Sequence, residues 1–194
     1  HKSQIEDITL NLSEANINSS KTIFDAKIGE LIHEILEDYA IERDKTEFLN
    51  RLSDKKNFWK CRIKHLSTNK NLLDESVQFI YETVEKCITK NELYWIFDES
   101  NSSSQSEFQI SWSKNGRINS YIIDRTLVDE NDVRWIIDYK TGVPRNESVE
   151  AFIEFQKKSH APQLEKYREA FKKIENRKTK AALLLTSITR LITI

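Results

Sequence analysis

The residues with the clearest chemical potential lie in residues 121–142, where two runs rich in apolar and β-branched residues flank a short acidic turn. This pattern predicts a β-hairpin. Each run contains one aspartate, Asp124 and Asp138, and Lys140 follows the second aspartate by two positions. A charge inside an apolar run costs free energy unless a partner compensates it. Two carboxylates and a lysine on one strand pair are the groups that a metal-dependent phosphodiesterase would need.

A third strand joins this hairpin through a strong turn signal. Residues 107–112 alternate between polar and apolar side chains, which predicts a strand with two different faces. The dipeptide Asn115-Gly116 follows and favours a two-residue hairpin loop. A loop of that length places Glu107 opposite Asp124, with both side chains on one face of the sheet.

The length of the acidic turn decides whether the two aspartates meet. A five-residue loop over 129–133 places Asp124 opposite Asp138, with Lys140 on the same face, whereas a four-residue loop turns Asp138 away. Together with Glu107, three carboxylates then share one face, which makes sense if a divalent cation lies between them. Such a cation can activate a water and neutralise charge on a phosphate. The lysine would orient the water or stabilise the pentavalent phosphorus.

Each of these residues also has an ordinary interpretation. Asp138 and Lys140 would then form an exposed ion pair of little energetic worth. Glu107 would be a solvent-facing glutamate on an edge strand, and Asp124 a turn or salt-bridge residue. For the pair of Asp138 and Lys140, its position inside the apolar run 134–140 favours the functional interpretation.

Residues 24–40 predict the clearest helix, because apolar side chains recur along one stripe at helical spacing. His33 lies just outside the edge of that stripe, and Gly29 lies on the same edge four residues earlier. Glycine inside a helix costs up to about 1 kcal/mol relative to alanine. Gly29 therefore suggests that another backbone or a ligand approaches closely beside His33, although an ordinary histidine on a helix flank is the alternative.

The remaining helices and strands are less sharply defined. Residues 46–66 and 72–90 predict two helices, residues 99–106 a loop, and residues 180–194 one or two strands that close the sheet. Residues 1–22 predict an irregular lead-in. The first of these helices contains a basic run, made up of Lys55, Lys56, Lys60, Arg62, Lys64 and His65. This run is either a solvated helix face or a surface that contacts a phosphate backbone.

Beyond the hairpin, residues 144–156 leave the sheet and are helical or irregular. Residues 161–175 predict a helix with Pro162 in its first turn. The apolar face of this helix includes Tyr167, and Gln163 lies on the same side one turn earlier.

Composition limits the class of protein. The 194 residues allow one domain, and the formal net charge of −1 excludes a wholly basic nucleic-acid binder but not a local basic face. Two cysteines, Cys61 and Cys87, are too few for a disulfide framework or a four-cysteine metal site. We therefore expect free thiols in a reducing compartment, which favours the cytoplasm. The sequence contains no membrane span and no signal peptide. It also lacks methionine, so we expect a domain of a longer protein.

Four motifs together resemble one family. Residues 136–142, which read Ile-Ile-Asp-Tyr-Lys-Thr-Gly and are preceded by Ile-Asp-Arg-Thr at 123–126, look like the core of the RecB-type nucleases of the PD-(D/E)XK superfamily. Residues 29–37 are similar to the family's first core helix with its histidine. Residues 163–167 are similar to its Gln-x-x-x-Tyr helix. The order and spacing suit the nuclease domain at the C-terminus of UvrD-type helicase–nucleases such as RecB and AddA.

The resemblance covers residues 24–40 and 105–190. It implies an α/β (α+β) fold with a restriction-endonuclease-like core, in which helices flank a central mixed β-sheet. Residues 23–194 would form one nuclease domain, preceded by a linker over 1–22 and carrying a helical insertion over about 41–98.

The family pattern also implies a role for the residues of the site. His33, Asp124 and Asp138 would bind Mg²⁺ or Mn²⁺, and the backbone carbonyl of Tyr139 would add a further oxygen. Lys140 would be the catalytic lysine. Some relatives carry an iron–sulfur cluster on four cysteines, which this chain lacks, so no iron–sulfur cluster is expected.

Other residues are implied to face the substrate. Gln163 and Tyr167 would contact DNA or brace the site, and Arg125 is a further candidate for substrate binding. Glu107 matches a glutamate that often precedes the motif in this subgroup and is a candidate catalytic residue. One position departs from the pattern, because Tyr121 stands where many relatives have a glycine.

The function that follows from the resemblance is a metal-dependent DNA nuclease. We expect an exonuclease that acts on a single-stranded end or a strand fed by a fused UvrD-type helicase, in DNA repair or recombination, with no membrane partner. A catalytically inactive module that binds DNA or a partner protein is the main alternative, and a stand-alone deoxyribonuclease of the same fold is another.

Overall fold

The computed structural model describes residues 23–98, 100–114 and 117–194. The sequence forms a five-stranded sheet in the order β1-β2-β3-β4-β5, in which the pair β3 and β4 is parallel and the other neighbours are antiparallel. The strands are β1 (Ser102–Lys114), β2 (Arg117–Val128), β3 (Arg134–Lys140), β4 (Thr179–Leu185) and β5 (Arg190–Thr193). The predicted lead-in over residues 1–22 lies outside the described residues.

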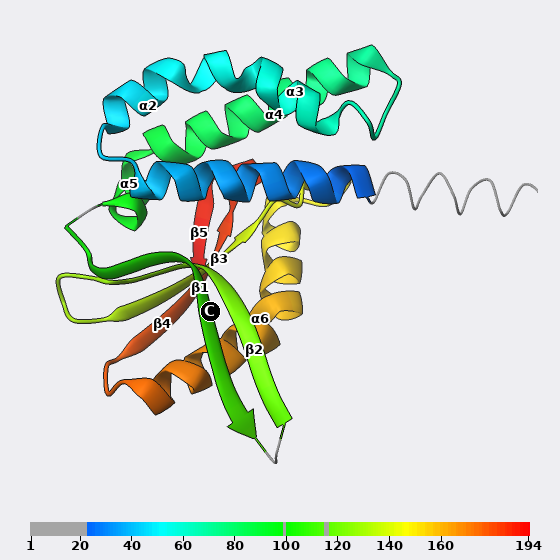
Figure 1. Ribbon diagram of the computed structural model, residues 1–194. Coiled ribbons are helices and arrows are strands. Elements are labelled where there is room, and N and C mark those ends of the chain that lie inside the picture. Colours follow the sequence, from blue (N-terminus) through cyan, green and yellow to red (C-terminus); the bar gives the residue numbers. More distant parts are fainter. Residues whose placement is uncertain (1–22, 99, 115–116) are drawn as a thin grey trace, which may run out of the picture.

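Helices cover both faces of this sheet (Figure 1). The N-terminal helix spans residues 23–41. It is followed by α2 (Lys45–Leu52), η1 (Ser53–Lys55), α3 (Lys56–Ile63), α4 (Lys70–Thr89), α5 (Asn91–Tyr94), η2 (Trp95–Phe97), α6 (Val149–Ile174) and η3 (Thr186–Ile188). The expected mixed sheet flanked by helices, an α+β restriction-endonuclease-like arrangement, is confirmed. None of the described helices has the length and apolar character needed to cross a membrane.

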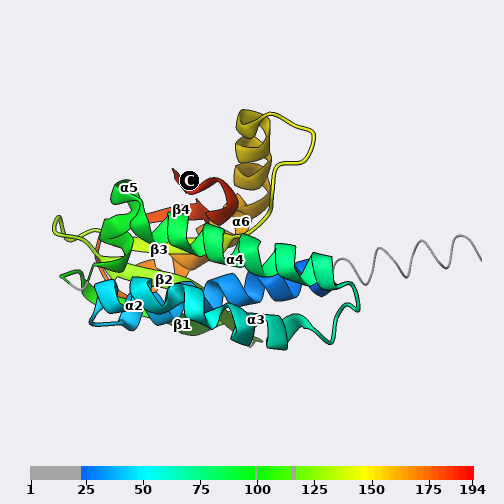
Figure 2. The ribbon, with the colours of Figure 1, turned by 90° about the horizontal axis from the view of Figure 1, so that it is seen from above.

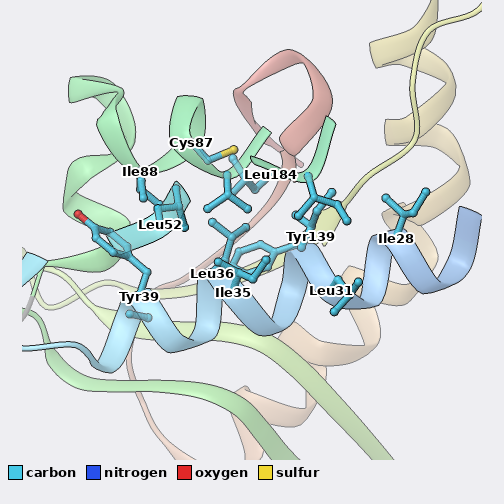
Figure 3. Packing of buried hydrophobic residues seen from close by; sticks show 14 of the residues in the cluster. Ile28, Leu31, Ile35, Leu36, Tyr39, Leu52, Cys87, Ile88, Tyr139 and Leu184 are labelled. Carbon is cyan, nitrogen blue, oxygen red and sulfur yellow. The ribbon is translucent and has the colours of Figure 1, made fainter. Parts of the chain in front are cut away.

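The alternation of side chains along the central strands creates two hydrophobic cores. Ile137 and Tyr139 of β3 and Leu184 of β4 face the N-terminal helix and α2–α4, where they join a buried cluster (Figure 3). Ile136 of β3 and Leu183 of β4 face the opposite side and pack with α6. Seen from above, the N-terminal helix and α4 run side by side over one face of the sheet (Figure 2).

The predicted helix over 46–66 is interrupted, whereas the predicted helix over 72–90 is α4. The Asp44 side chain accepts the N–H of Glu47 at 2.8 Å and so begins α2. The helix changes to a 3₁₀ turn at Ser53 and Asp54, residue types whose side chains compete for backbone hydrogen bonds.

The basic run of this region is engaged within the protein. Lys55, Lys60 and Arg62 pair with carboxylates of the N-terminal helix and α4, and the Arg62 guanidinium binds both oxygens of Glu34. Lys56 lies over the ring of Tyr81, 3.9 Å from its centroid. These contacts favour the interpretation as an ordinary solvated helix face.

The described part of the serine-rich segment predicted as a loop belongs largely to β1, which begins at Ser102. Polar side chains fit this edge strand because one arginine binds two of them: Arg125 donates to the hydroxyls of Ser104 and Ser106. The register shifts between Ser102 and Gln105, so the strand starts irregularly.

The last helix is longer than the sequence indicated. α6 begins at Val149, where the Ser148 side chain accepts the N–H of Ala151 at 3.2 Å, and Pro162 lies inside the helix rather than in its first turn. Proline lacks an N–H and its ring crowds the preceding turn, which bends a helix. The ribbon of α6 bends accordingly (Figure 1). Two strands, β4 and β5, close the sheet as predicted.

Candidate active site

The strand registers that position the site agree with the sequence. Lys114 lies opposite Arg117 and Phe108 opposite Ile123, as a two-residue hairpin loop requires. The Asn115-Gly116 turn itself lies outside the described residues. In the second hairpin, β2 pairs with β3 from Val128 opposite Arg134 to Arg125 opposite Ile137, across the predicted five-residue loop.

The pairing of β2 with β3 ends one position before Asp124 and Asp138. There the Asp124 carboxylate takes the place of a backbone partner, because its Oδ2 accepts the N–H of Tyr139 at 2.6 Å. On the neighbouring strand, Glu107 has a positive φ of 48° and is left out of the ladder. The two aspartates therefore lie at the point where the strands stop pairing.

His33 reaches this point from the N-terminal helix. Its Nδ1 lies 3.5 Å from Oδ1 of Asp124, and its ring meets the ring of Tyr139 edge to face at 5.5 Å between centroids. A Cβ atom on Gly29 would lie 2.8 Å from Oγ1 of Thr141. A close neighbour at Gly29 is thus confirmed, but the approaching group is the Thr141 side chain, directly after β3, and not the expected backbone or ligand.

Asp138 is buried and forms an ion pair with the partly exposed Lys140. Nζ of Lys140 lies 2.8 Å from Oδ2 of Asp138, and Asp138 is only 3% exposed. The alternative of an exposed ion pair is therefore wrong. Burial raises the pKa of the Asp138 carboxyl, and the nearby Asp124 charge raises it further. Lys140 and His33 act in the opposite direction without cancelling the shift.

Glu107 lies near the same group, although its side chain is exposed. Burial of part of the carboxyl raises its pKa, and so does the charge of Asp124. Glu37, one turn after His33 on the N-terminal helix, has a pKa that is raised by burial and by Glu107. The sequence analysis missed Glu37, which the spacing of four residues from His33 could have indicated.

Gln163 and Tyr167 lie at the site from the α6 side. The Gln163 side-chain amide lies 3.5 Å from Oδ1 of Asp138 and donates to the hydroxyl of Tyr167. That hydroxyl in turn donates to the carbonyl of Ile122 at 3.3 Å. The ring of Tyr121 packs edge to face against Tyr167 at 5.4 Å. These contacts connect α6 with β2 and β3 around Asp138.

His160, which no sequence motif indicated, lies beside Gln163 on α6. Burial lowers the pKa of His160, the Lys140 ammonium lowers it further, and the hydrogen bond with Gln163 opposes both. The three-residue spacing from Gln163 would have indicated this neighbour. The predicted helix began at residue 161 and so excluded it.

Arg125 does not have the position expected of a substrate-binding residue. It is 2% exposed, and its guanidinium donates to the Ile96 carbonyl at 3.1 Å and to the hydroxyls of Ser104 and Ser106. Arg125 thus holds β1 and β2 against η2, on the side covered by the helices. A contact with substrate would require these bonds to break.

The donor atoms of the site suit a divalent cation. Within residues 23–98, 100–114 and 117–194, no group of three or more His, Cys, Asp or Glu side chains is arranged as a ready set of ligands. However, Oδ2 of Asp138 is buried, and its close polar partner among the described residues is the Lys140 ammonium at 2.8 Å. Carboxylate oxygens with one imidazole are ligands that Mg²⁺ or Mn²⁺ accepts.

Comparison with known families decides the assignment. The model of the PD-(D/E)XK nuclease superfamily matches residues 10–191. The chain belongs to this superfamily. PD-(D/E)XK proteins are nucleases, hydrolases that generally use divalent metals.

Other comparisons add little to this assignment. A crystal structure of protein VC1899 from Vibrio cholerae is similar over 69% of this chain at 14% identity, with a TM-score of 0.27. The matched part is 43% of that protein, so this chain spans less than half of its length. No curated protein sequence matches this PD-(D/E)XK chain significantly.

Proposed function

We propose that this PD-(D/E)XK protein is a divalent-metal-dependent deoxyribonuclease that hydrolyses phosphodiester bonds in DNA. The observation that carries the proposal is the buried Asp138 carboxylate with Lys140 beside it, which lies with Asp124 and His33 where β2 and β3 stop pairing. A buried carboxylate beside a second carboxylate is unfavourable by itself. The same arrangement is favourable when a cation shares the two charges.

His33, Asp124 and Asp138 are the residues that would hold Mg²⁺ or Mn²⁺, with the Tyr139 carbonyl as a further oxygen. When bound, such a cation supplies charge neutralisation and a more acidic water. In this proposal the Lys140 ammonium, a mobile donor next to Asp138, stabilises the negative charge that develops on the phosphoryl oxygens.

The surrounding residues would keep these groups in position. Gln163 donates toward Asp138 and to Tyr167, so its amide fixes the carboxylate from the α6 side. The hydrogen bond with His160 holds the orientation of the Gln163 amide. Precise orientation of this kind is valuable because small displacements of reacting groups slow a reaction strongly.

The finer assignment follows from the motifs. His33 on the first helix and Gln163 with Tyr167 on α6 support a RecB-type nuclease, and the proposed activity is that of an exonuclease in DNA repair or recombination. The proposed partners are DNA with a single-stranded end and a UvrD-type helicase fused to this domain.

The experiment is a cleavage assay on end-labelled linear, internally labelled and circular DNA with Mg²⁺, Mn²⁺ or EDTA. The wild type should release nucleotides from linear DNA only when a metal is present, and Asp138→Asn and Lys140→Ala should abolish release. Lys86→Ala, which removes an exposed lysine of α4, is the matched control and should retain full activity.

Two outcomes would redirect the proposal. Cleavage of circular DNA would identify an endonuclease. Binding of DNA with no metal-dependent cleavage, unchanged in Asp138→Asn, would contradict the enzyme and favour a non-cleaving module of the same fold.

A further inference from the structure

An open hollow of about 990 Å³ lies beside the candidate active site. Residues of the N-terminal helix, α4 and the first half of α6 bound it (Figure 1). Thr141 and Gly142 form one of its edges. Because Thr141 directly follows Lys140, the hollow begins one residue from the site.

Aromatic side chains line this hollow to an unusual extent. Four of the nine phenylalanines of the chain contribute to it, namely Phe24, Phe79, Phe152 and Phe155. Phe155 is 65% exposed, and Val143 at the edge is 50% exposed. Phe24 and Phe152 belong to the buried cores and form the floor of the hollow, whereas Phe155 and Val143 forgo the gain from burial, which is typical of a binding surface.

The polar groups of the hollow lie at its rim. Arg145 is exposed, and among the described residues its guanidinium forms no ion pair. The neighbouring Glu147 carboxylate is turned toward its own loop, where it accepts the N–H groups of Arg145 and Asn146 at 3.3 and 3.1 Å. Asp25 and Glu75, both exposed, also line the hollow and make this part of it unfavourable for a phosphate.

We propose that this hollow binds an unstacked base of single-stranded DNA next to the phosphate that is cleaved. The base would stack on Phe155 and its aromatic neighbours, and the phosphate that follows would meet Arg145 at the rim. Base faces are neutral and aromatic, so they tolerate the acidic lining and gain from the phenylalanines. This inference rests on the proposed nuclease function and assigns one base of the proposed single-stranded end to the hollow.

The dimensions of the hollow favour a single strand over a duplex. A volume of about 990 Å³ is that of a small-molecule pocket, which accommodates one or two splayed bases but not a stack of base pairs. Bases can enter such a pocket only from a strand that is not paired.

The test is fluorescence anisotropy with a labelled 12-nucleotide single strand and with the matching blunt duplex, in EDTA so that no cleavage occurs. Phe155→Ala should weaken binding of the single strand by about tenfold, the loss expected for one stacked base, and leave duplex binding unchanged. Phe58→Ala is the matched control, because Phe58 is 61% exposed on α3 and does not line the hollow. Phe155→Trp should restore binding.

A second variant separates base from phosphate contacts. Arg145→Ala should reduce the slope of log affinity against log salt by about one, the change expected for one phosphate contact. Phe155→Ala should leave that slope unchanged, because stacking releases no counterions.

Several results would overturn the inference. Equal effects of Phe155→Ala and Phe58→Ala, or no effect of either, would exclude a base in the hollow. A concentration-dependent dimer that Phe155→Ala abolishes would identify a contact between two copies instead. A large fall of the melting temperature in Phe155→Ala would mean that the chain itself fills the hollow.

The result is distinguishable from a failure of the nuclease proposal. If the wild type binds the single strand through Phe155 but never cleaves it with a metal, the hollow is confirmed and the enzyme is not. If the wild type cleaves DNA and Phe155 has no influence on single-strand binding, the nuclease stands and the inference about the hollow is wrong.

Discussion

Replacement of Gly29 by alanine tests how the N-terminal helix is placed against the end of β3. In an ordinary helix interior this change stabilises a protein by up to about 1 kcal/mol. Here the new Cβ atom would lie 2.8 Å from Oγ1 of Thr141, closer than such atoms approach in folded proteins. The Cβ and Cγ2 atoms of Thr141 lie at 3.8 and 3.9 Å, which are ordinary contacts. A single oxygen atom therefore carries the whole conflict.

The expected magnitude follows from these two opposing effects. Overpacking of a close contact costs about 1–3 kcal/mol, because threonine is stiff and either its side chain or the helix must shift. After subtraction of the gain in helix propensity, Gly29→Ala should lower the free energy of unfolding by up to about 2 kcal/mol. The shift of the helix also displaces His33, so DNA cleavage should fall more than stability does.

Urea unfolding followed by tryptophan fluorescence measures the change in two backgrounds. In Thr141→Ala the clashing oxygen is gone, and Gly29→Ala should there stabilise the protein by about 1 kcal/mol. In Thr141→Val a methyl group replaces the oxygen, so the conflict should persist. Equal effects of Gly29→Ala in the wild type and in both backgrounds would refute the reasoning, because the predicted coupling of about 1–3 kcal/mol would be missing.

Three further predictions follow from single contacts. Asp124→Asn should abolish cleavage and keep the unfolding free energy, because the amide oxygen still accepts a peptide N–H, whereas Asp124→Ala should also lose about 1–3 kcal/mol in urea unfolding. Arg134→Ala should cost about 3–5 kcal/mol, because its ion pair is buried, against less than about 1 kcal/mol for the exposed control Arg51→Ala. Burial raises the pKa of the Cys87 thiol from 9.0 to about 12, so the folded state holds this proton more tightly than the unfolded chain. The contribution of this proton to the free energy of unfolding is complete below pH 9 and is lost as pH rises toward 12. At pH 8 a thiol reagent should therefore label Cys61 in the native protein and Cys87 only after denaturation.

The registers of the sheet were predictable because loop length fixes the pairing of a hairpin. The five-residue loop over 129–133 has the predicted length, and Asp129 stabilises it by accepting the N–H groups of Asn131 and Val133. A close neighbour at Gly29 was also predictable, because glycine destabilises a helix interior relative to alanine and is expected there only where a side chain would not fit. The sequence could not indicate that this neighbour is Thr141, which lies more than a hundred residues away along the chain.

One element was missed and a second was left undecided between helix and irregular structure, because their side-chain patterns reflect distant partners. The serines at the start of β1 are typical of a loop, and they form a strand because buried Arg125 binds two of their hydroxyls. The first half of α6 lacks a clear apolar stripe because Phe155 faces the open hollow, whereas Phe152 is buried. A pattern that depends on one buried face cannot reveal a helix that borders a cavity.

The interrupted pairing at Asp124 explains why the candidate site lies where it does. A continuous ladder would satisfy the N–H of Tyr139 with a backbone carbonyl and would leave no room between β2 and β3. Instead the carboxylate accepts that N–H at 2.6 Å, and the strands end their pairing at Arg125 and Ile137. One oxygen of Asp124 thus supports the fold while the other faces His33 at 3.5 Å. Where the pairing of β2 with β3 ends, the His33 imidazole lies beside Asp124 from the N-terminal helix. The Gln163 amide lies beside Asp138 from α6, on the other face of the sheet.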